Sequence, residues 1–147
     1  MIHWHTYGFD ELPVGLLYGL LKLRQDVFIV EQQSIYPDLD GLDELCGHLL
    51  GLNGDVLAAY LRLVPPGKKY KEPSLGRIIV HQDYRGKKLG YQLVQEGIQF
   101  AEKKYGEVPI RIEAQAHLEK FYSKLGFRVM TDPFDADGIP HIEMLRD

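Results

Sequence analysis

Residues 75 to 106 read LGRIIVHQDYRGKKLGYQLVQEGIQFAEKKYG, and this stretch decides the fold. The β-branched run from Leu75 to Val80 predicts a buried strand, and the turn-forming residues 83 to 88 end it. From Leu89 onward, apolar residues recur at helical spacing until Gly106, a residue type that commonly ends helices. The stretch therefore predicts a strand, a tight turn and a helix in direct succession.

The turn in this unit carries three cations and two glycines within six positions: Arg85, Gly86, Lys87, Lys88, Leu89 and Gly90. Free backbone N–H groups at a helix N-terminus bind phosphate, and glycine lets an anion approach the main chain. The local positive charge opposes the net charge of −4 of the whole chain. We interpret residues 85 to 90 as an anion site, with a solvated basic surface as the alternative. The spacing is neither that of a Walker loop nor that of a dinucleotide fingerprint.

The flanking segments complete a mixed pattern. Before the central unit, the sequence predicts a strand at residues 2 to 7, a helix of about four turns after Pro13 and an acidic loop at 34 to 44. Asn53-Gly54 is a strong hairpin signal, so residues 46 to 52 and 55 to 64 are expected to pair as antiparallel strands. After it, the sequence predicts a strand at 108 to 113, a short helix at 118 to 125, and closing strands at 127 to 130 and 141 to 145.

This order of elements predicts a single mixed α/β domain with at least one right-handed strand-helix-strand crossover. A length of 147 residues with 45% hydrophobic composition suits one domain with its own core. The acidic balance argues against a broad nucleic-acid-binding face. Cys46 is the only cysteine, which excludes a disulfide framework or a cysteine-based zinc site and favours the cytoplasm. We expect no signal peptide and no membrane span.

A second motif lies at residues 122 to 127, which read YSKLGF. Together with the turn, this Tyr-x-x-x-Gly-Phe pattern resembles the GNAT N-acetyltransferase superfamily, whose pyrophosphate loop has the form Q/R-x-x-G-x-G/A. Arg85 and Gly90 match the ends of that pattern, whereas Lys88 occupies the position of its middle glycine. A Cβ at that position is expected to narrow the space for the pyrophosphate, although the backbone N–H remains.

The resemblance extends over nearly the whole chain. Residues 23 to 32, Asp40-Gly41 and residues 138 to 144 are similar to the ElaA-type branch of the superfamily. This resemblance implies a GNAT-like domain over residues 1 to 147, with a mostly antiparallel sheet splayed between its fourth and fifth strands. It implies acetyl-coenzyme A as co-substrate, the pantetheine arm lying along Ile78, Ile79 and Val80 and the phosphates on residues 85 to 90. The amine acceptor is not identified by the branch.

The resemblance also implies catalytic roles. Tyr122 matches the superfamily tyrosine that protonates the coenzyme A thiolate, and the alternative is that it only fills the core. Many relatives carry a glutamate base on the fourth strand, but here that strand offers Arg77 and His81 instead. Histidine is the side-chain type best suited to accept a proton near neutral pH, and His141 is our candidate base, with Glu113, Glu31 and water as rivals.

We therefore expect an acetyl-coenzyme A-dependent N-acetyltransferase that transfers directly to a primary amine. The alternative is a non-catalytic acyl-coenzyme A-binding or interaction module, which Lys88 and the missing glutamate favour. A metal is not expected, because His3 and His5 lack a third ligand of fixed spacing. The basic loop at residues 68 to 71 reads as a solvated surface rather than a nucleic-acid site. We hypothesise that Asp38, Asp40 and Asp43 border the amine entrance, and the oligomeric state stays open.

Overall fold

The computed structural model describes residues 1 to 147 in full. Its helices and strands follow the alternation of apolar and polar residues along the chain. In chain order they are β1 (His3–Gly8), α1 (Val14–Arg24), β2 (Gly47–Asn53), β3 (Val56–Val64), β4 (Ser74–Val80), α2 (Leu89–Tyr105), β5 (Ile110–Gln115), α3 (Glu119–Ser123), β6 (Arg128–Val129), β7 (Phe134–Ala136) and β8 (Ile139–Arg146). No helix combines the length and the apolar character needed to cross a bilayer.

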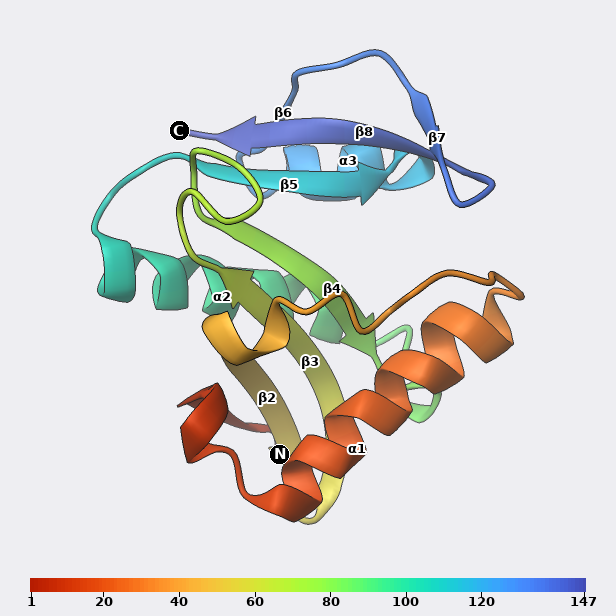
Figure 1. Cartoon of the computed structure of the whole chain (residues 1–147), viewed down its shortest axis with the longest axis vertical. Coiled ribbons are helices and arrows are strands. Elements are labelled where there is room, and N and C mark those ends of the chain that lie inside the picture. The colour runs from red at the N-terminus through yellow and green to blue at the C-terminus, as the bar shows by residue number, and fades with distance from the viewer.

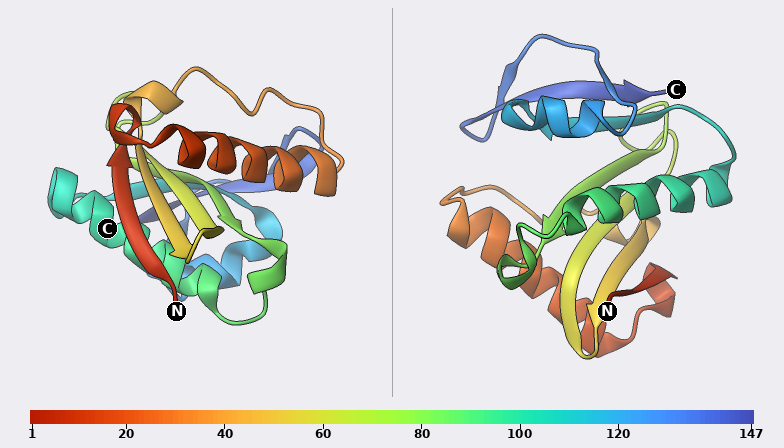
Figure 2. Two further views of the ribbon diagram at one scale, coloured as in Figure 1. Left: turned by 90° about the horizontal axis from the view of Figure 1, so that it is seen from below. Right: turned by 180° about the vertical axis from the view of Figure 1, so that it is seen from behind.

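All strands belong to one sheet in the order β1-β2-β3-β4-β5-β8-β6, with β7 paired to β8 (Figure 1). Helix α1 covers one face of this sheet, and α2 and α3 cover the other (Figure 2). The larger apolar cluster packs α2 against the sheet through residues such as Leu61, Leu93 and Ile112. The smaller cluster packs α1 against Leu50 and Tyr60. The predicted mixed α/β domain is confirmed.

The sheet is splayed between β4 and β5, as the family resemblance implied. These two strands are the parallel pair, and they are joined at one register position, Ser74 opposite Arg111. There the N–H of Arg111 donates to the carbonyl of Pro73 at 3.0 Å. Beyond this point the strands diverge, so the edge of β4 that faces β5 has no strand partner over most of its length (Figure 1).

Strand β4 contains a bulge at Arg77. The register between β3 and β4 shifts by one residue between Tyr60 and Arg62, and Arg77 has a φ of 50°. The extra residue reverses the alternation of side chains. Consequently Leu75 packs in the cluster under α2, whereas Ile79, four residues later, packs in the cluster under α1. The apolar run of β4 gave no signal of this bulge, because a strand buried on both faces lacks alternation.

The element boundaries differ from the sequence-based ones by small amounts. Asn53 pairs with Val56, so the residues that form the turn of the predicted hairpin are Gly54 and Asp55. Strand β5 begins two residues later than expected, at Ile110. Helix α1 continues through a π-helical segment, Gln25–Glu31, which carries its C-terminal end toward the splayed strands. π-helical turns are rare and occur frequently at functional sites.

Strand β7 was not predicted. It forms a hairpin with β8 through Asp137 and Gly138, whose φ angles of 53° and 83° suit a two-residue turn. Asp-Gly is one of the strongest short hairpin signals, but the three-residue strand before it is too short to show a pattern of its own. This hairpin brings His141 to the splayed part of the sheet.

Candidate functional site

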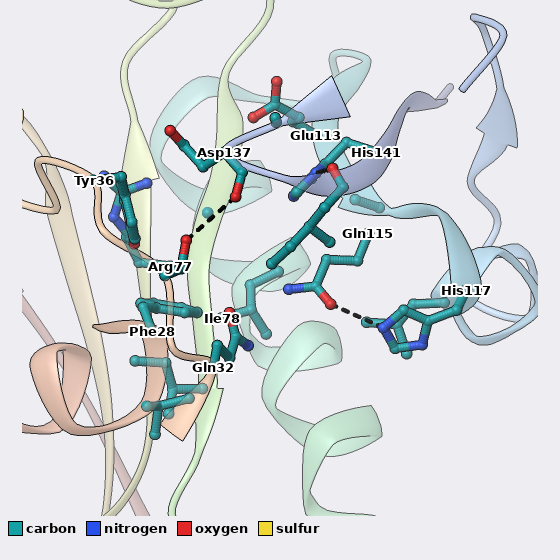
Figure 3. Close-up of a pocket in the computed structure, with 18 of the residues that line it drawn as sticks. Phe28, Gln32, Tyr36, Arg77, Ile78, Glu113, Gln115, His117, Asp137 and His141 are labelled. Carbon is teal, nitrogen blue, oxygen red and sulfur yellow. Dashed lines mark hydrogen bonds between the residues drawn. The ribbon is translucent and has the colours of Figure 1, made fainter. Parts of the chain in front are cut away.

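A cleft of about 520 Å³ lies where β4 and β5 separate (Figure 3). The backbone of residues 76 to 80 forms one wall, and residues 113 to 115 of β5 form the other. The segment that follows α1 contributes Phe28, Gln32 and Tyr36 at the side of β4, as Figure 3 shows. A bridge closes part of the opening, because the hydroxyl of Ser34 donates to the carbonyl of Asp137 at 3.4 Å.

The predicted phosphate turn adjoins this cleft through Arg85, which lines it, and leads into α2 at Leu89. Gly86 and Lys88 have φ angles of 82° and 60°. Outside the regular helices and strands, no backbone hydrogen bond is donated by residues 86 to 91. The N–H groups of these residues therefore lack partners in the protein, at the positive end of a helix of 17 residues. This arrangement is suited to binding phosphate oxygens.

Lys88 departs from the family pattern in sequence but not in backbone conformation. Its left-handed φ of 60° is one that glycine adopts without strain and that costs other residues roughly 1–2 kcal/mol. The side chain is exposed. The turn thus keeps the backbone path that a glycine would give, with an ammonium group added at its surface.

Arg85, the first cation of the turn, is engaged by the protein itself. Its Nη1 and Nη2 atoms donate to the two carboxylate oxygens of Glu31 at 2.6 and 3.0 Å, and its Nε donates to the carbonyl of Val80 at 3.1 Å. The hydrogen bonds from Arg85 hold the pKa of Glu31 below its usual value. Glu31 is therefore a poor proton acceptor at neutral pH, which weakens its candidacy as the base.

Tyr122 lies in the cleft with its ring in the core. The residue is 5% exposed, and its ring makes edge contacts with Phe121 and Phe127 at 5.0 and 5.9 Å between centroids. Burial raises the pKa of its hydroxyl, so the proton is retained at neutral pH. The hydroxyl has no hydrogen-bond partner in the protein. It is nevertheless not among the polar atoms that are completely buried without a partner, and Tyr122 lines the cleft, so the hydroxyl opens into the cleft. The core role and the chemical role are therefore compatible.

His141 and Glu113 lie on the opposite wall from β4 (Figure 3). The Nδ1 atom of His141 is 2.7 Å from the carbonyl oxygen of Ile139. Because a carbonyl only accepts, Nδ1 carries the hydrogen in the neutral ring and Nε2 has a free lone pair. His141 stands opposite Gln115 in the β5–β8 register, two positions along from the pair of Glu113 and Glu143. The side chains of His141 and Glu113 therefore point to the same face of the sheet.

The acidic loop does not have the role that the sequence suggested. Arg24 and Arg62 are 0% and 2% exposed. Arg24 bonds the carboxylates of Asp38 and Asp43 at 2.9 and 2.7 Å, and Arg62 bonds those of Asp40 and Asp43. None of the three aspartates lines the cleft. They anchor the loop to the sheet rather than attract a cationic acceptor, contrary to our hypothesis.

The same network extends to the bulge of β4. The guanidinium of Arg77 forms an ion pair with the carboxylate of Asp38 at 2.8 Å and donates a hydrogen bond to the carbonyl of Asp38 at 2.9 Å. It also lies 5.5 Å from the centre of the Tyr36 ring. Arg77 lines the cleft, so the anchored loop also fixes a wall residue. Burial opposes ionisation of Asp40, but its hydrogen bonds from Arg62 and Leu42 hold its pKa below the usual value.

Several residues that line the cleft were not predicted from the sequence, and Lys69 is a charged one among them. It belongs to the basic loop that we read as solvated, yet its Nζ lies 3.8 Å from a carboxylate oxygen of Glu113. Burial lowers the pKa of Lys69. The available signal was Tyr70, an aromatic residue between lysines, which packs on Arg111 of β5 and draws the loop onto the sheet.

Comparisons with known proteins agree with this geometry. Residues 51–146 match the family model described as "Acetyltransferase (GNAT) domain". The chain is 41% identical to ElaA of Escherichia coli over 100% of this chain and 97% of that protein. The crystal structure of E. coli ElaA superposes with a TM-score of 0.94 at 39% identity, each chain being covered completely. An acyl-CoA N-acyltransferase from Pseudomonas aeruginosa superposes with a TM-score of 0.96 at 37% identity, again over both whole chains. The chain therefore belongs to the GNAT acetyltransferase family, as a homologue of ElaA.

Proposed function

We propose that this protein is an acetyl-coenzyme A-dependent N-acetyltransferase that transfers the acetyl group directly to a primary amine. The observation that carries the proposal is the cleft itself. It joins a free strand edge on β4 with the open hydroxyl of Tyr122, and Arg85 in its lining leads directly to the row of unpartnered amides at the start of α2. An acyl-coenzyme A needs these three features, because it has amide groups in its arm, a diphosphate at one end and a thiolate to be protonated.

The donor side of the cleft binds and orients. The amides of residues 86 to 90 would hold the diphosphate, with Lys87 and Lys88 adding charge. The exposed edge formed by Ile78, Ile79 and Val80 would pair with the amides of the pantetheine arm as an added strand does. A backbone N–H of the same edge would stabilise the negative charge that develops on the thioester oxygen.

Two side chains move protons in this proposal. The Nε2 atom of His141 accepts a proton from the ammonium group of the acceptor, which leaves the neutral amine needed for attack on the thioester carbon. As the C–N bond forms and the C–S bond breaks, Tyr122 donates its proton to the departing thiolate. It regains a proton from the nitrogen that becomes the amide. Each turnover therefore releases one proton, which leaves from His141.

Release of coenzyme A tests the proposal. The protein is incubated with acetyl-coenzyme A and a panel of primary amines, and the free thiol is followed with a thiol reagent. Amine-dependent thiol release is expected. Its absence with every amine in the panel would overturn the assignment as an enzyme.

A non-catalytic acyl-coenzyme A-binding module is the second candidate. Two observations favour it. Strand β4 and the residue that follows it present Arg77 and His81 where many members of the family carry a glutamate, and Arg85 is already paired with Glu31. A ligand at a hundred times its Kd adds about 2.7 kcal/mol to stability, which thermal shift detects readily. Stabilisation by acetyl-coenzyme A without thiol release for any amine would select the module.

A further inference from the structure

Lys69 and Glu113 form an ion pair in the wall of the cleft that is held loosely. Their charged atoms are 3.8 Å apart, beyond hydrogen-bond distance, and each side chain is 32% exposed. Neither charged group makes a hydrogen bond elsewhere in the protein, although Lys69 is steadied by the Tyr70 ring at 5.4 Å. The ammonium and the carboxylate therefore keep their hydrogen-bonding capacity for a ligand.

The other strong charges of the cleft are already engaged or lie at its rim. Arg85 is bound by Glu31, and Arg77 is bound by Asp38. Asp137 is exposed at the tip of the hairpin that joins β7 and β8. The pair of Lys69 and Glu113 is thus the available charge pattern inside the cleft.

The pair faces the acceptor side. Ile110, Ile112 and Ala114 of β5 pack into the cluster under α2, so Glu113 points to the opposite face of the sheet. The phosphate turn opens α2 and therefore belongs to the donor side. His141 shares the face of Glu113 because it stands two register positions away on the neighbouring strand. A group held by Glu113 would lie beside the nitrogen that we assign as proton acceptor.

We propose that the acceptor is a free α-amino acid, with its ammonium group on Glu113 and its carboxylate on Lys69. This inference rests on the proposed N-acetyltransferase function and names the substrate class for the same cleft. An α-amino acid carries both charges on one carbon, and the wall offers the two complementary charges side by side. A simple amine leaves Lys69 without a partner, and a polyamine brings further cations against it. An amino acid amide, like the N-terminus of a peptide, lacks the carboxylate that Lys69 would bind.

Matched sets of acceptors test this substrate class in the unaltered protein. Each of the twenty proteinogenic α-amino acids is compared with its α-carboxamide and with the amine that lacks the carboxyl group, and kcat/KM is measured from thiol release. A charged hydrogen bond supports a preference of about 10- to 100-fold for the amino acid of at least one set. Amides or simple amines that react as well as every amino acid would refute the substrate class and leave the proposed function standing. No release with any compound would overturn both.

Substitution of Lys69 tests the assigned contact. Lys69→Gln is expected to lower kcat/KM for the preferred amino acid about 10- to 100-fold and to leave the matched amide within about twofold. Lys68→Gln is the control, because the neighbouring lysine is exposed and does not line the cleft. Equal loss for the acid and the amide in Lys69→Gln would contradict the contact. Thermal unfolding of both variants shows whether the fold is retained.

Discussion

The pairing of Glu31 with Arg85 leads to a prediction about how the proposed donor, acetyl-coenzyme A, would bind. Glu31 forms two hydrogen bonds with Arg85, at 2.6 and 3.0 Å, and the side chains are 42% and 40% exposed. Exposed ion pairs contribute about 0.2–1 kcal/mol, and this two-bond geometry belongs near the upper end of that range. A diphosphate on the turn must compete with the Glu31 carboxylate for Arg85 and also lie near its negative charge.

Glu31→Gln is therefore expected to tighten binding of coenzyme A up to about fivefold, which corresponds to about 1 kcal/mol. Arg85 keeps its position in this variant because its Nε also donates to the carbonyl of Val80. The assay is isothermal titration calorimetry with coenzyme A at low and at high salt, and the gain should shrink as salt screens the charges.

Glu107→Gln is the matched control, since Glu107 is exposed beyond the far end of α2, about 25 Å from the turn. Unchanged affinity in Glu31→Gln would show that Glu31 does not compete. Weaker binding in that variant, with the control unchanged, would show that Glu31 holds Arg85 in its binding position and would refute the reasoning.

Three further predictions concern the catalytic acid, the turn and the buried ion pairs. Tyr122→Phe should lower kcat about 100-fold or more with the Kd of coenzyme A unchanged, because the proposed role of the hydroxyl is proton transfer alone. Steady-state rates and calorimetry check this prediction, and the control Tyr105→Phe should match the unaltered protein. Lys88→Gly should raise the free energy of urea unfolding by up to about 1 kcal/mol by relieving its φ of 60°, whereas a loss of stability would argue that the side chain contributes. Asp43→Asn should cost about 3–5 kcal/mol in the same assay by leaving Arg24 and Arg62 short of a partner, with Asp55→Asn as the exposed control. Burial opposes ionisation of Asp43, yet Arg24 and Arg62 lower its pKa. The stability that the Asp43 carboxylate contributes should therefore be present above pH 3.8, the ordinary pKa of the group, and be lost as the pH falls through the lowered pKa. Unfolding measured from pH 6 to pH 2 would reveal this loss.

The turn and helix that form the proposed donor side were predictable as structure because their signals are local. The residues of the phosphate turn and of α2 are contiguous, so spacing alone placed the strand, the turn and the helix. Tyr122 came from a short motif together with the family resemblance. The same resemblance, rather than any pattern of apolar residues, gave the splay between β4 and β5. The left-handed conformation of Lys88 was invisible, because lysine gives no signal of positive φ.

The proposed acceptor side depends on contacts between segments that are distant in the sequence. Lys69 and Glu113 are 44 positions apart in the sequence, and they meet because Tyr70 packs its loop on β5. Arg24 lies in an apolar run of the sequence, and partners from the acidic loop allow its charged side chain to be buried completely. Charged residues that find partners far along the chain look, in sequence, like surface residues.

A single register position joins β4 to β5, so the sheet consists of two parts, β1 to β4 and β5 to β8, that are connected by strand pairing at one point. A movement that separates β4 and β5 further at the open end of the cleft would break no backbone hydrogen bond between these strands, since none exists beyond the position of Ser74 and Arg111. The width of the mouth is consequently set by side chains and by the contact between Ser34 and Asp137. Substitutions in the segments that contain Ser34 and Asp137 can therefore change the width of the cleft while the pairing of Ser74 with Arg111 is kept.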